Sequence, residues 1–435
     1  MTLLSSPWHS ALSRSTQSDS MSPYRATALE AGVIAPNWHW IESPLAFDSF
    51  ELDLLTRRLA CIESLIFDLP QRLFRGDHAA FYETLGLEAD ISRWLCRFRN
   101  RACMTPLRWD LVPTREGWKL VEINAGVCMG GMNFELIQGV YTQMRDADQK
   151  IVPPQWPSSL QALIDFLVRC NRDCQTGACV ALLEDDDVFE CYGFFLDSLV
   201  RYFTAHSPWQ IVSGKVSSLA KKKDAIYLHG KPVDAVLGMF CARDMFRHPA
   251  RYRTLTEGLT SGTIDSLLHP AAETVYGNKA ILALLWQLVS CASTSDEQRE
   301  ALLAVLPETH AMSRYTPASL SQIQDAVVIK PCEGYGGEGV ICGWEHSAQS
   351  FQRICQARLS NGTNYVVQRR VEVHAFPMQV SMASGESIDA QGRPVIGLIT
   401  LGGKATAGIV RSFFRPHANA VVNVHNGAAV GPAAF

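Results

Sequence analysis

The chain has 435 residues, of which 47% are hydrophobic and 19% are charged. At roughly 150 residues per domain this length predicts two or three structural units, and the composition excludes a disordered or low-complexity protein. The 39 Lys and Arg residues against 43 Asp and Glu residues give a formal net charge of -4. This balance supplies no basic field for nucleic acid, so we expect small-molecule partners.

Cysteine usage and the lack of targeting signals predict a cytoplasmic protein. The 13 Cys residues are scattered and form no C-x-x-C pair, which is typical of a reducing compartment. No segment reaches the ~18 apolar residues that span a bilayer, so no membrane partner is expected. The Ser-rich N-terminus lacks the pattern of a secretory signal, and residues 1–25 are expected to form a flexible arm.

The first third of the chain begins with a helical pattern over 48–98, where apolar residues recur two to four positions apart. From Arg108 to Asn124 the period changes to two, and 134–144 is helical again. Three prolines between Val152 and Pro157 break any regular element. We place a boundary there, which gives a first unit over 26–151.

The rest of the chain alternates helices and strands and then consists mostly of strands. A helix over 158–168 precedes a strand, a helix and a strand at 179–183, 189–203 and 234–238, which favours a small α/β unit over 152–275. In the third unit, 276–435, a helix follows Asn278 and strand patterns occur at 327–343, 365–371, 395–401 and 407–414. The Ala/Gly/Val-rich tail from Asn419 has no assigned role.

The segment Leu107–Asn124 predicts a β-hairpin whose register follows from its turn. A three-residue loop over Arg115–Gly117 places Gly where a positive φ is required, and Thr114 then pairs with Trp118. Because side chains alternate along a strand, one face would carry two opposed polar pairs: Arg108 with Asn124, and Asp110 with Glu122.

Two directly opposed carboxylates, Asp110 and Glu122, repel each other unless a cation lies between them. With the Asn124 side chain they form a hard-oxygen set that suits Mg²⁺ holding phosphate oxygens. The solvent-facing polar side of an ordinary hairpin is the alternative. The glycines at 126, 130 and 131 favour a ligand site, since their backbone can approach a ligand closely.

A second candidate site begins where a β-branched strand delivers Lys330. The next residues include four glycines in six positions, and the candidates among them are Glu333, Gly334, Gly336 and Gly337. Backbone N–H groups of such a loop can bend over phosphates while the lysine supplies a point charge. The segment is neither a Walker motif nor a dinucleotide fingerprint, and a flexible turn is the alternative.

Four further features each allow a functional and a structural interpretation. Lys279 begins a helix, where it could reach a nucleotide or cap a surface turn, and Gln368 could read an adenine edge or be exposed. Arg411 could clamp an anionic transition state or lie on the surface. An acidic run could receive a cationic amine or cap a helix, and it consists of Glu184, Asp185, Asp186 and Asp187, with Glu190 close behind.

Taken together, these residues resemble the ATP-grasp ligases, specifically the circularly permuted branch that includes the synthetase domain of glutathionylspermidine synthase. In that branch an Arg-x-Asp is followed, twelve residues after the Asp, by Glu-x-Asn. Arg108-Trp109-Asp110 and Glu122-Ile123-Asn124 match both motifs. The match covers most of residues 100–415. It implies an α+β, circularly permuted ATP-grasp fold with an additional small α/β, pre-ATP-grasp-like domain.

The resemblance implies ATP and Mg²⁺ as cofactors and gives the hairpin residues their roles. Asp110, Glu122 and Asn124 would bind Mg²⁺, within a first unit made of a helical region and this hairpin. Arg108 would hold the transferred phosphate and the substrate carboxylate, and Arg411 would steady an acyl phosphate.

The third unit would hold the nucleotide in an ATP-binding lid with the remaining ATP-grasp strands. Lys279 and Lys330 would contact the ATP phosphates, the loop over 333–339 would close over them, and Gln368 would lie in the adenine pocket. The loop lacks the family's usual Gly-Arg-Glu-Gly core. Val127 and Met129 stand where glutathionylspermidine synthases carry small hydroxyl residues, so glutathione is not the expected acid.

The expected function is an ATP-dependent carboxylate–amine ligase that forms an amide through an acyl phosphate and releases ADP and phosphate. The expected acid is a small amino acid or peptide-like molecule of a specialised pathway, with the middle unit on the substrate side and Glu184, Asp185 and Glu190 near the substrate. A phosphotransferase and a non-catalytic nucleotide-binding module are the alternatives. The sequence leaves the oligomeric state open, a homodimer included.

Overall fold

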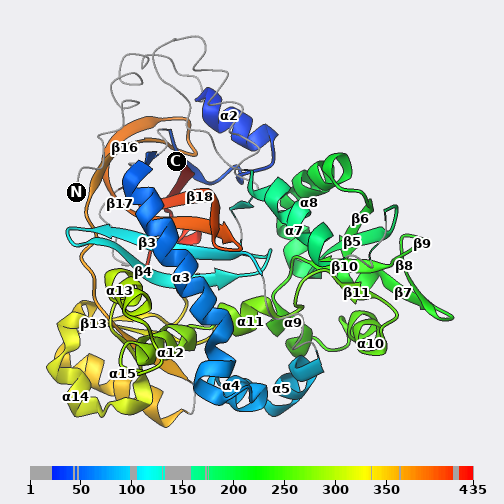
Figure 1. Cartoon of the computed structure of the whole chain (residues 1–435). Helices are drawn as coiled ribbons and strands as arrows, with labels where there is room; N and C mark the ends of the chain where they lie inside the picture. The colour runs from blue at the N-terminus through cyan, green and yellow to red at the C-terminus, as the bar shows by residue number, and fades with distance from the viewer. Residues whose placement is uncertain are drawn as a thin grey trace.

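The computed structural model describes residues 22–42, 45–46, 49–97, 105–129, 131–132, 158–171, 174, 176–334, 336–361, 364–414 and 421–434. Over these residues the fold mixes α-helices with four β-sheets, as the α+β expectation requires. An eight-stranded sheet occupies the centre, and two smaller units flank it (Figure 1).

The eight-stranded sheet has the order β16-β1-β19-β18-β17-β3-β4, and β2 pairs with β19. Its strands are β1 (His39–Ile41), β2 (Leu45–Ala46), β3 (Leu107–Thr114), β4 (Gly117–Ala125), β16 (Phe376–Ser381), β17 (Ser387–Leu401), β18 (Lys404–Phe413) and β19 (Ala429–Ala434). Only the pairings of β19 with β1 and β2 are parallel among these described strands. Because β4 is the last strand in this order, the hairpin of β3 and β4 forms one end of the sheet.

Helix α3 (Ser49–Phe74) crosses the face of this sheet (Figure 1). Its inner side chains recur every three or four residues and are buried, namely Leu55, Leu59, Ile62, Ile66 and Leu69, which is the spacing of a helix packed on one face. Glu63 of the same helix accepts hydrogen bonds from Thr400 Oγ1 at 2.7 Å and Gly403 N at 3.0 Å. The helical pattern predicted over 48–98 corresponds to three helices, α3, α4 (His78–Thr84) and α5 (Ala89–Leu95).

The N-terminal arm differs from the expectation at its end. Pro23–Glu30 forms helix α2, in which Tyr24 and Arg25 are buried. Tyr24 belongs to a hydrophobic cluster with Trp40 and Val430 of the central sheet, and Arg25 Nη2 donates to the carbonyl oxygen of Pro36 at 2.5 Å. The expectation for 1–21 lies outside the described residues.

The small α/β unit contains the predicted helix, strand, helix and strand in that order, but it also has strands at Gln210–Lys215 and Asp265–Ser266 that are not predicted from the sequence. Its parallel sheet has the order β11-β10-β5-β6. The strands are β5 (Cys179–Glu184), β6 (Gln210–Lys215), β10 (Ala235–Gly238) and β11 (Asp265–Ser266), and the helices are α7 (Ser159–Cys170), α8 (Asp186–His206), α9 (Ala242–Arg247) and α10 (Arg253–Ser261). A second sheet of β7 (Leu219–Lys222), β8 (Ala225–Leu228) and β9 (Lys231–Pro232) projects from it (Figure 1). The helix expected at 134–144 and the boundary at 152–157 lie outside the described residues.

The second flanking unit contains an antiparallel sheet in the order β12-β15-β13-β14. Its strands are β12 (Thr309–Ala311), β13 (Val327–Pro331), β14 (Ile341–Cys342) and β15 (Tyr365–Arg369), and its helices are α12 (Ala280–Leu288), α13 (Asp296–Val305), α14 (Pro317–Gln322) and α15 (Ala348–Ser360). Helix α11 (Ala272–Tyr276) precedes this unit and packs against β4 and α9. The expectation of mostly strands beyond 278 is wrong in part. Helix α15 is not predicted from the sequence, although its Phe351, Ile354, Cys355 and Leu359 recur at helical spacing and pack in one cluster.

The Ala/Gly/Val-rich tail forms β19, an inner strand between β1 and β18. A Cβ on Gly431 would lie 2.7 Å from Ile41 Cβ, so the neighbouring backbone approaches too closely for a larger residue. The small residues of the tail therefore have a packing role in the central sheet.

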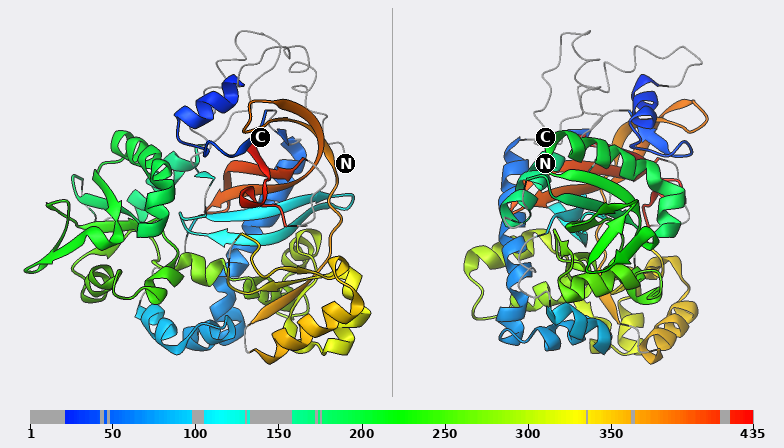
Figure 2. Two further views of the ribbon diagram at one scale, coloured as in Figure 1. Left: turned by 180° about the vertical axis from the view of Figure 1, so that it is seen from behind. Right: turned by 90° about the vertical axis from the view of Figure 1, so that its right-hand side faces the viewer.

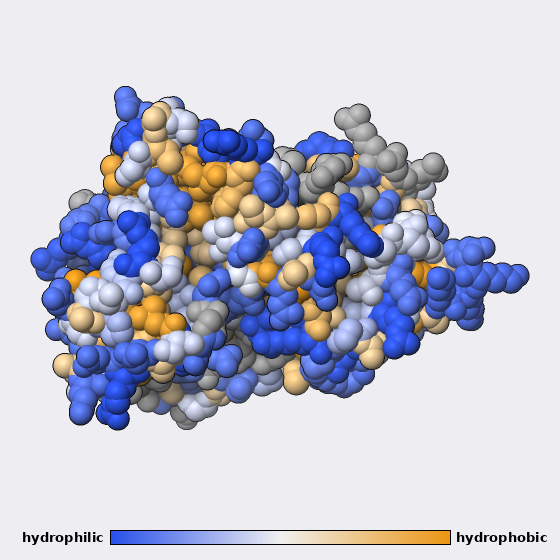
Figure 3. Space-filling model, turned by 90° about the horizontal axis from the view of Figure 1, so that it is seen from below, coloured by the Kyte–Doolittle hydropathy of each residue, from blue (hydrophilic) through white to orange (hydrophobic). Residues whose placement is uncertain are grey.

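Views from behind and from the side show the two units on different sides of the central sheet (Figure 2). Seen from below, polar residues cover most of the surface and hydrophobic residues gather in a few separate areas (Figure 3). No helix in the described part of the chain is both long and apolar enough to cross a membrane.

Candidate active site

A cleft of about 1460 Å³ lies where the central sheet and the two flanking units meet. Strands β3, β4 and β18 line one side, β13 and β15 line another, and β5 and β10 line a third. The cleft brings together most of the residues that the sequence singles out, namely Arg108, Asp110, Glu122, Asn124, Glu184, Lys279, Lys330, Gly334, Gly336, Gly337, Gln368 and Arg411. Glu333, Asp185 and Glu190 are not among the lining residues.

The hairpin of β3 and β4 has the predicted pairing at the site. Asp110 is opposite Glu122, and Arg108 is opposite Asn124. All four residues line the cleft, so the interpretation of this face as the solvent-exposed side of an ordinary hairpin is wrong.

The turn of the same hairpin differs from the prediction. Thr114 pairs with Gly117 rather than with Trp118, so the loop has two residues instead of three. Gly117 has a φ of 110°, as a turn glycine requires. A β-bulge between Asp110 and Leu111 adds one residue to β4, and this extra residue, Val121, restores the register at the site.

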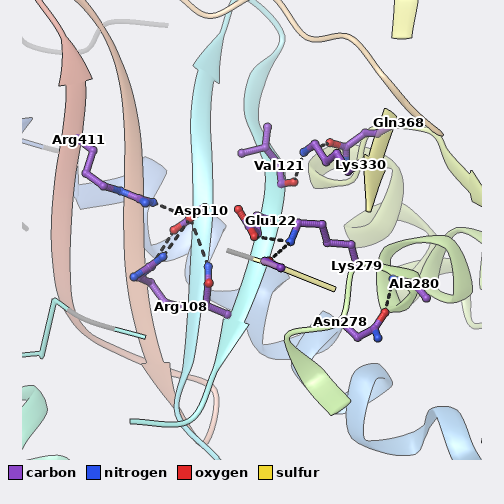
Figure 4. A network of polar contacts seen from close by, with 12 residues as sticks. Arg108, Asp110, Val121, Glu122, Asn278, Lys279, Ala280, Lys330, Gln368 and Arg411 are labelled. Atoms are coloured by element: carbon purple, nitrogen blue, oxygen red, sulfur yellow. Dashed lines mark hydrogen bonds and ion pairs between the residues drawn. The ribbon is translucent and has the colours of Figure 1, made fainter. Parts of the chain in front are cut away.

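Asp110 is held by three side chains from β3, β4 and β18 (Figure 4). Arg108 Nε donates to its Oδ1 at 2.9 Å, Arg411 Nη2 lies 2.6 Å from its Oδ2, and Asn124 Nδ2 donates to Oδ2 at 3.3 Å. Burial raises the pKa of Asp110, but Arg108 and Arg411 outweigh this and hold the pKa at about 2. The buried Nε of Arg411 has no hydrogen-bond partner among the described residues. It is a donor that an anionic ligand can use.

Glu122 is paired with Lys279, which precedes α12. Lys279 Nζ lies 2.8 Å from Glu122 Oε1 and donates to the carbonyl oxygen of Gly334 at 2.8 Å. Asn278 Oδ1 accepts from Ala280 N at 2.9 Å and fixes the start of the helix. Lys279 is 5% exposed, so its interpretation as the cap of a surface turn is wrong. It connects the hairpin to the glycine-rich loop.

Lys330 on β13 reaches across to the central sheet. Its Nζ donates to the carbonyl oxygen of Val121 at 2.6 Å and to Gln368 Oε1 at 2.8 Å (Figure 4). Val121 is the extra residue of the bulge, so no residue of β3 is opposite it. Burial lowers the pKa of Lys330 to about 8, against the opposing effect of Glu122. The ammonium group is therefore mostly charged at neutral pH.

Gln368 is buried rather than exposed. Its Oε1 accepts from Lys330, and its Nε2 donates to Thr309 Oγ1 at 3.2 Å. Both ends of the amide are thus used within the protein. In this arrangement the Gln368 side chain orients the ammonium group of Lys330.

The glycine-rich loop joins β13 to β14, as predicted. Gly334, Gly336, Gly337 and Gly339 all have positive φ values, between 70° and 119°, a region that residues with a Cβ rarely adopt. A Cβ on Gly337 would lie 2.1 Å from Val421 Cγ1, so the loop packs against the segment that precedes β19.

The acidic run divides into one cleft residue and several structural ones. Asp185 caps α8, accepting from Asp187 N at 3.0 Å, and Arg251 Nη1 lies 2.9 Å from it. Glu190 is paired with Lys215. Glu184 lines the cleft, where burial raises its pKa to about 8. At neutral pH Glu184 is mostly protonated and is a hydrogen-bonding group rather than a fixed counter-ion.

No group of three or more His, Cys, Asp or Glu side chains within the described ranges could hold a metal ion. Mg²⁺ needs only one or two carboxylates when waters and substrate phosphates complete its shell. Asp110 and Glu122, with the Asn124 amide beside them, supply this donor set, so the residues present fit Mg²⁺ brought in with a nucleotide.

Three residues of the site belong to no motif in the sequence. Thr309 is fully buried behind the cleft, where it accepts a hydrogen bond from Gln368. Trp344 and Arg370 line the cleft, and the Arg370 guanidinium lies 4.0 Å from the centre of the Trp344 ring. A Trp beside a strand–glycine-loop–strand segment is a signal for a flat ligand surface, and it would have identified Trp344.

No protein-family model matches this chain, and no curated protein matches its sequence. Among solved structures, the chain is similar to a glutathione synthetase-like effector from Globodera pallida in its apo form. The TM-score is 0.56 at 12% identity, and the alignment covers 94% of this chain and 95% of that one.

At this level of identity the likeness concerns the fold alone. It extends over nearly the whole of both chains, so the central sheet and both flanking units take part in it. The chain therefore has a glutathione synthetase-like fold.

Proposed function

We propose that this protein is an ATP-dependent ligase that joins a carboxylic acid to an amine as an amide. One observation carries the proposal. Arg108, Lys279, Lys330 and Arg411, from four distant segments of the chain, converge on the ionised Asp110 and on Glu122 in one cleft. Cationic side chains gathered around a pair of carboxylates suit a polyphosphate that binds together with its metal ion.

In this proposal the nucleotide lies between β4 and the β13–β14 loop. Lys279 and Lys330 hold the phosphates, and the positive-φ glycines let the loop backbone bend over them. The adenine then lies toward Trp344, on the side of the cleft formed by β13 and β15. The likeness to a glutathione synthetase-like protein supports this assignment at the level of fold.

The circularly permuted arrangement is part of the proposal. The hairpin with Asp110 and Glu122 precedes the strand of Lys330 in the chain, as the permuted branch requires. When bound, Mg²⁺ supplies neutralisation of phosphate charge, and Asp110, Glu122 and Asn124 are the residues that would hold it.

Catalysis would consist of positioning and charge neutralisation. An oxygen of the acid's carboxylate bonds to the γ-phosphorus, the bond to the β–γ bridging oxygen breaks, and ADP leaves. The amine nitrogen then bonds to the acyl carbon, phosphate leaves with the C–O bond electrons, and a proton passes from the amine to solvent. Arg108 and Arg411 face the transferred group, and the unpartnered Nε of Arg411 is a donor for it. The partners would be these small-molecule substrates.

The test measures ADP release from Mg-ATP by the purified protein across pools of acids and amines. Glu122→Gln is expected to lower the rate by about 100-fold or more, since it removes a charge at the phosphate site. Glu300→Gln is the matched control, because this carboxylate is 74% exposed in a surface ion pair.

The outcomes separate the alternatives. Amine-dependent ADP release with a new amide mass supports the ligase. An acid-dependent product that hydroxylamine does not trap indicates a phosphotransferase instead. Binding of ATP without ADP release on any pool of acids and amines contradicts an enzymatic function.

A further inference from the structure

The cleft is larger than a single ligand requires. Sites for one small molecule usually have volumes of about 300–1,000 Å³, whereas this cleft has about 1460 Å³. The charged residues of the proposed ATP site line only part of it. The remaining part has a different chemical character and faces the small α/β unit.

This second part is a wall of apolar side chains, which we call the apolar wall. It consists of Met129, Met132, Leu182, Leu199, Leu237 and Met239. All six also belong to or pack against one hydrophobic cluster of the small α/β unit. Five of them are at most 9% exposed and Met239 is half-buried, so the core behind them fixes their positions along the cleft.

The place of the wall in the fold is one where ligands bind. Leu182 and Leu237 lie near the carboxyl ends of β5 and β10, and Met239 directly follows β10. These strands are parallel neighbours. In open parallel sheets ligands bind outside the carboxyl ends of the strands. This rule identifies the same wall without reference to the cavity.

The wall is continuous with the charged site. Arg108 Nη1 donates a hydrogen bond to the carbonyl oxygen of Met129. The arginine that is ion-paired with Asp110 thus also contacts the first residue of the wall. Glu184 lies at the same strand ends and is mostly protonated at neutral pH. It adds little negative charge that would repel an acid.

We propose that the acid activated at this site carries an apolar carbon chain. Its carboxylate lies at Arg108 and Arg411, and its chain lies against the apolar wall. This inference rests on the proposed function, which supplies the acid and its attack on the γ-phosphorus of ATP, and it adds the substrate class.

The experiment is calorimetric titration of the full chain, in the presence of Mg-ADP, with butyrate, hexanoate and octanoate. Each buried methylene contributes about 0.8 kcal/mol, which is roughly a fourfold gain in affinity. Octanoate is therefore expected to bind more than about 50-fold more tightly than butyrate. Octanedioate, which has the same length and a charged far end, is expected to bind no better than butyrate.

Two variants locate the effect. Met239→Glu places a charge in the wall and is expected to weaken octanoate binding by about tenfold or more. Val168→Glu is the matched control, because Val168 is in the same unit, is 38% exposed and does not line the cleft. Circular dichroism checks that both variants fold, and the chain-length series on the unmodified protein does not depend on them.

Each outcome decides between the two proposals. Affinity that rises with chain length supports the apolar acid. Equal affinities for all three acids, or no binding of any acid by a protein that binds Mg-ADP, overturn the proposal of an apolar acid. If charged acids still stimulate ADP release in that case, the ligase function stands. If affinity rises with chain length as expected but no hydroxamate forms from octanoate, ATP and hydroxylamine, the apolar site is supported and the ligase function is contradicted.

Discussion

Replacing Asp110 with Asn tests how much the charged cluster contributes to stability. The carboxylate is 2% exposed, and its pKa is about 2 against an ordinary value of 3.8. This difference corresponds to about 2 kcal/mol at neutral pH, at ~1.4 kcal/mol per pKa unit. Asn also leaves Arg108 and Arg411 without their anion, and removal of one partner of a buried pair costs about 3–5 kcal/mol. We expect Asp110→Asn to lower the free energy of unfolding by about 2–5 kcal/mol.

The assay is urea unfolding at pH 7, with Asp187→Asn as control. Asp187 contacts Arg251, but its side chain is 78% exposed, so the control is expected to change stability by less than about 1 kcal/mol. Because the pKa of Asp110 is lowered by folding, its contribution is full above pH 4 and is lost as the pH falls toward 2. The difference between Asp110→Asn and the unmodified protein should narrow in that range. A loss below about 1 kcal/mol at pH 7 would refute the reasoning.

Three other predictions follow from single residues. Because the pKa of Lys330 is about 8 in the ligand-free protein, its charge is present at pH 7 and mostly lost at pH 9.5, so Mg-ATP affinity measured by calorimetry should fall about tenfold or more over that interval. A flat profile would exclude Lys330 from phosphate binding. Gly337→Ala, at a φ of 81° and with a Cβ 2.1 Å from Val421, should weaken Mg-ATP binding about tenfold. Gly385→Ala, at a φ of 94° in open space, should leave that affinity unchanged. Ser295→Ala removes the cap of α13, whose Oγ accepts from Gln298 N, and should cost about 1 kcal/mol in urea unfolding without altering ADP release.

The sequence predicts the polar pairs of the site more reliably than the backbone that supports them. The opposed pairs on β3 and β4 follow from a period of two and a carboxylate motif, and both are present. The turn is one residue shorter than predicted, and the bulge at Val121 compensates for it. The bulge breaks the alternation along β4, where Val121 and Glu122 are both half-buried between Leu120 and Ile123. Its position depends on what packs against the strand. Here Lys330, more than 200 residues later in the chain, bonds to the carbonyl oxygen of the extra residue.

Elements with weak local patterns are missed for a related reason. The residues of β19 are too small and uniform to show the alternation of a half-buried strand. Their strand conformation comes from neighbours on both sides. The apolar wall is likewise assembled from two loops, two strands and a helix, none of which indicates a ligand site alone.

The inner position of β19 determines the order in which this protein can complete its fold. His39 pairs with Ala429, about 390 residues later, and contacts so far apart in sequence form slowly because a long loop must close first. During synthesis β1 must wait for nearly the whole chain to emerge before it gains this partner. Until then this edge of β1 stays unpaired, and an unpaired edge invites association with other chains. The central sheet of this protein is therefore completed only at the end of folding, when β19 enters between β1 and β18.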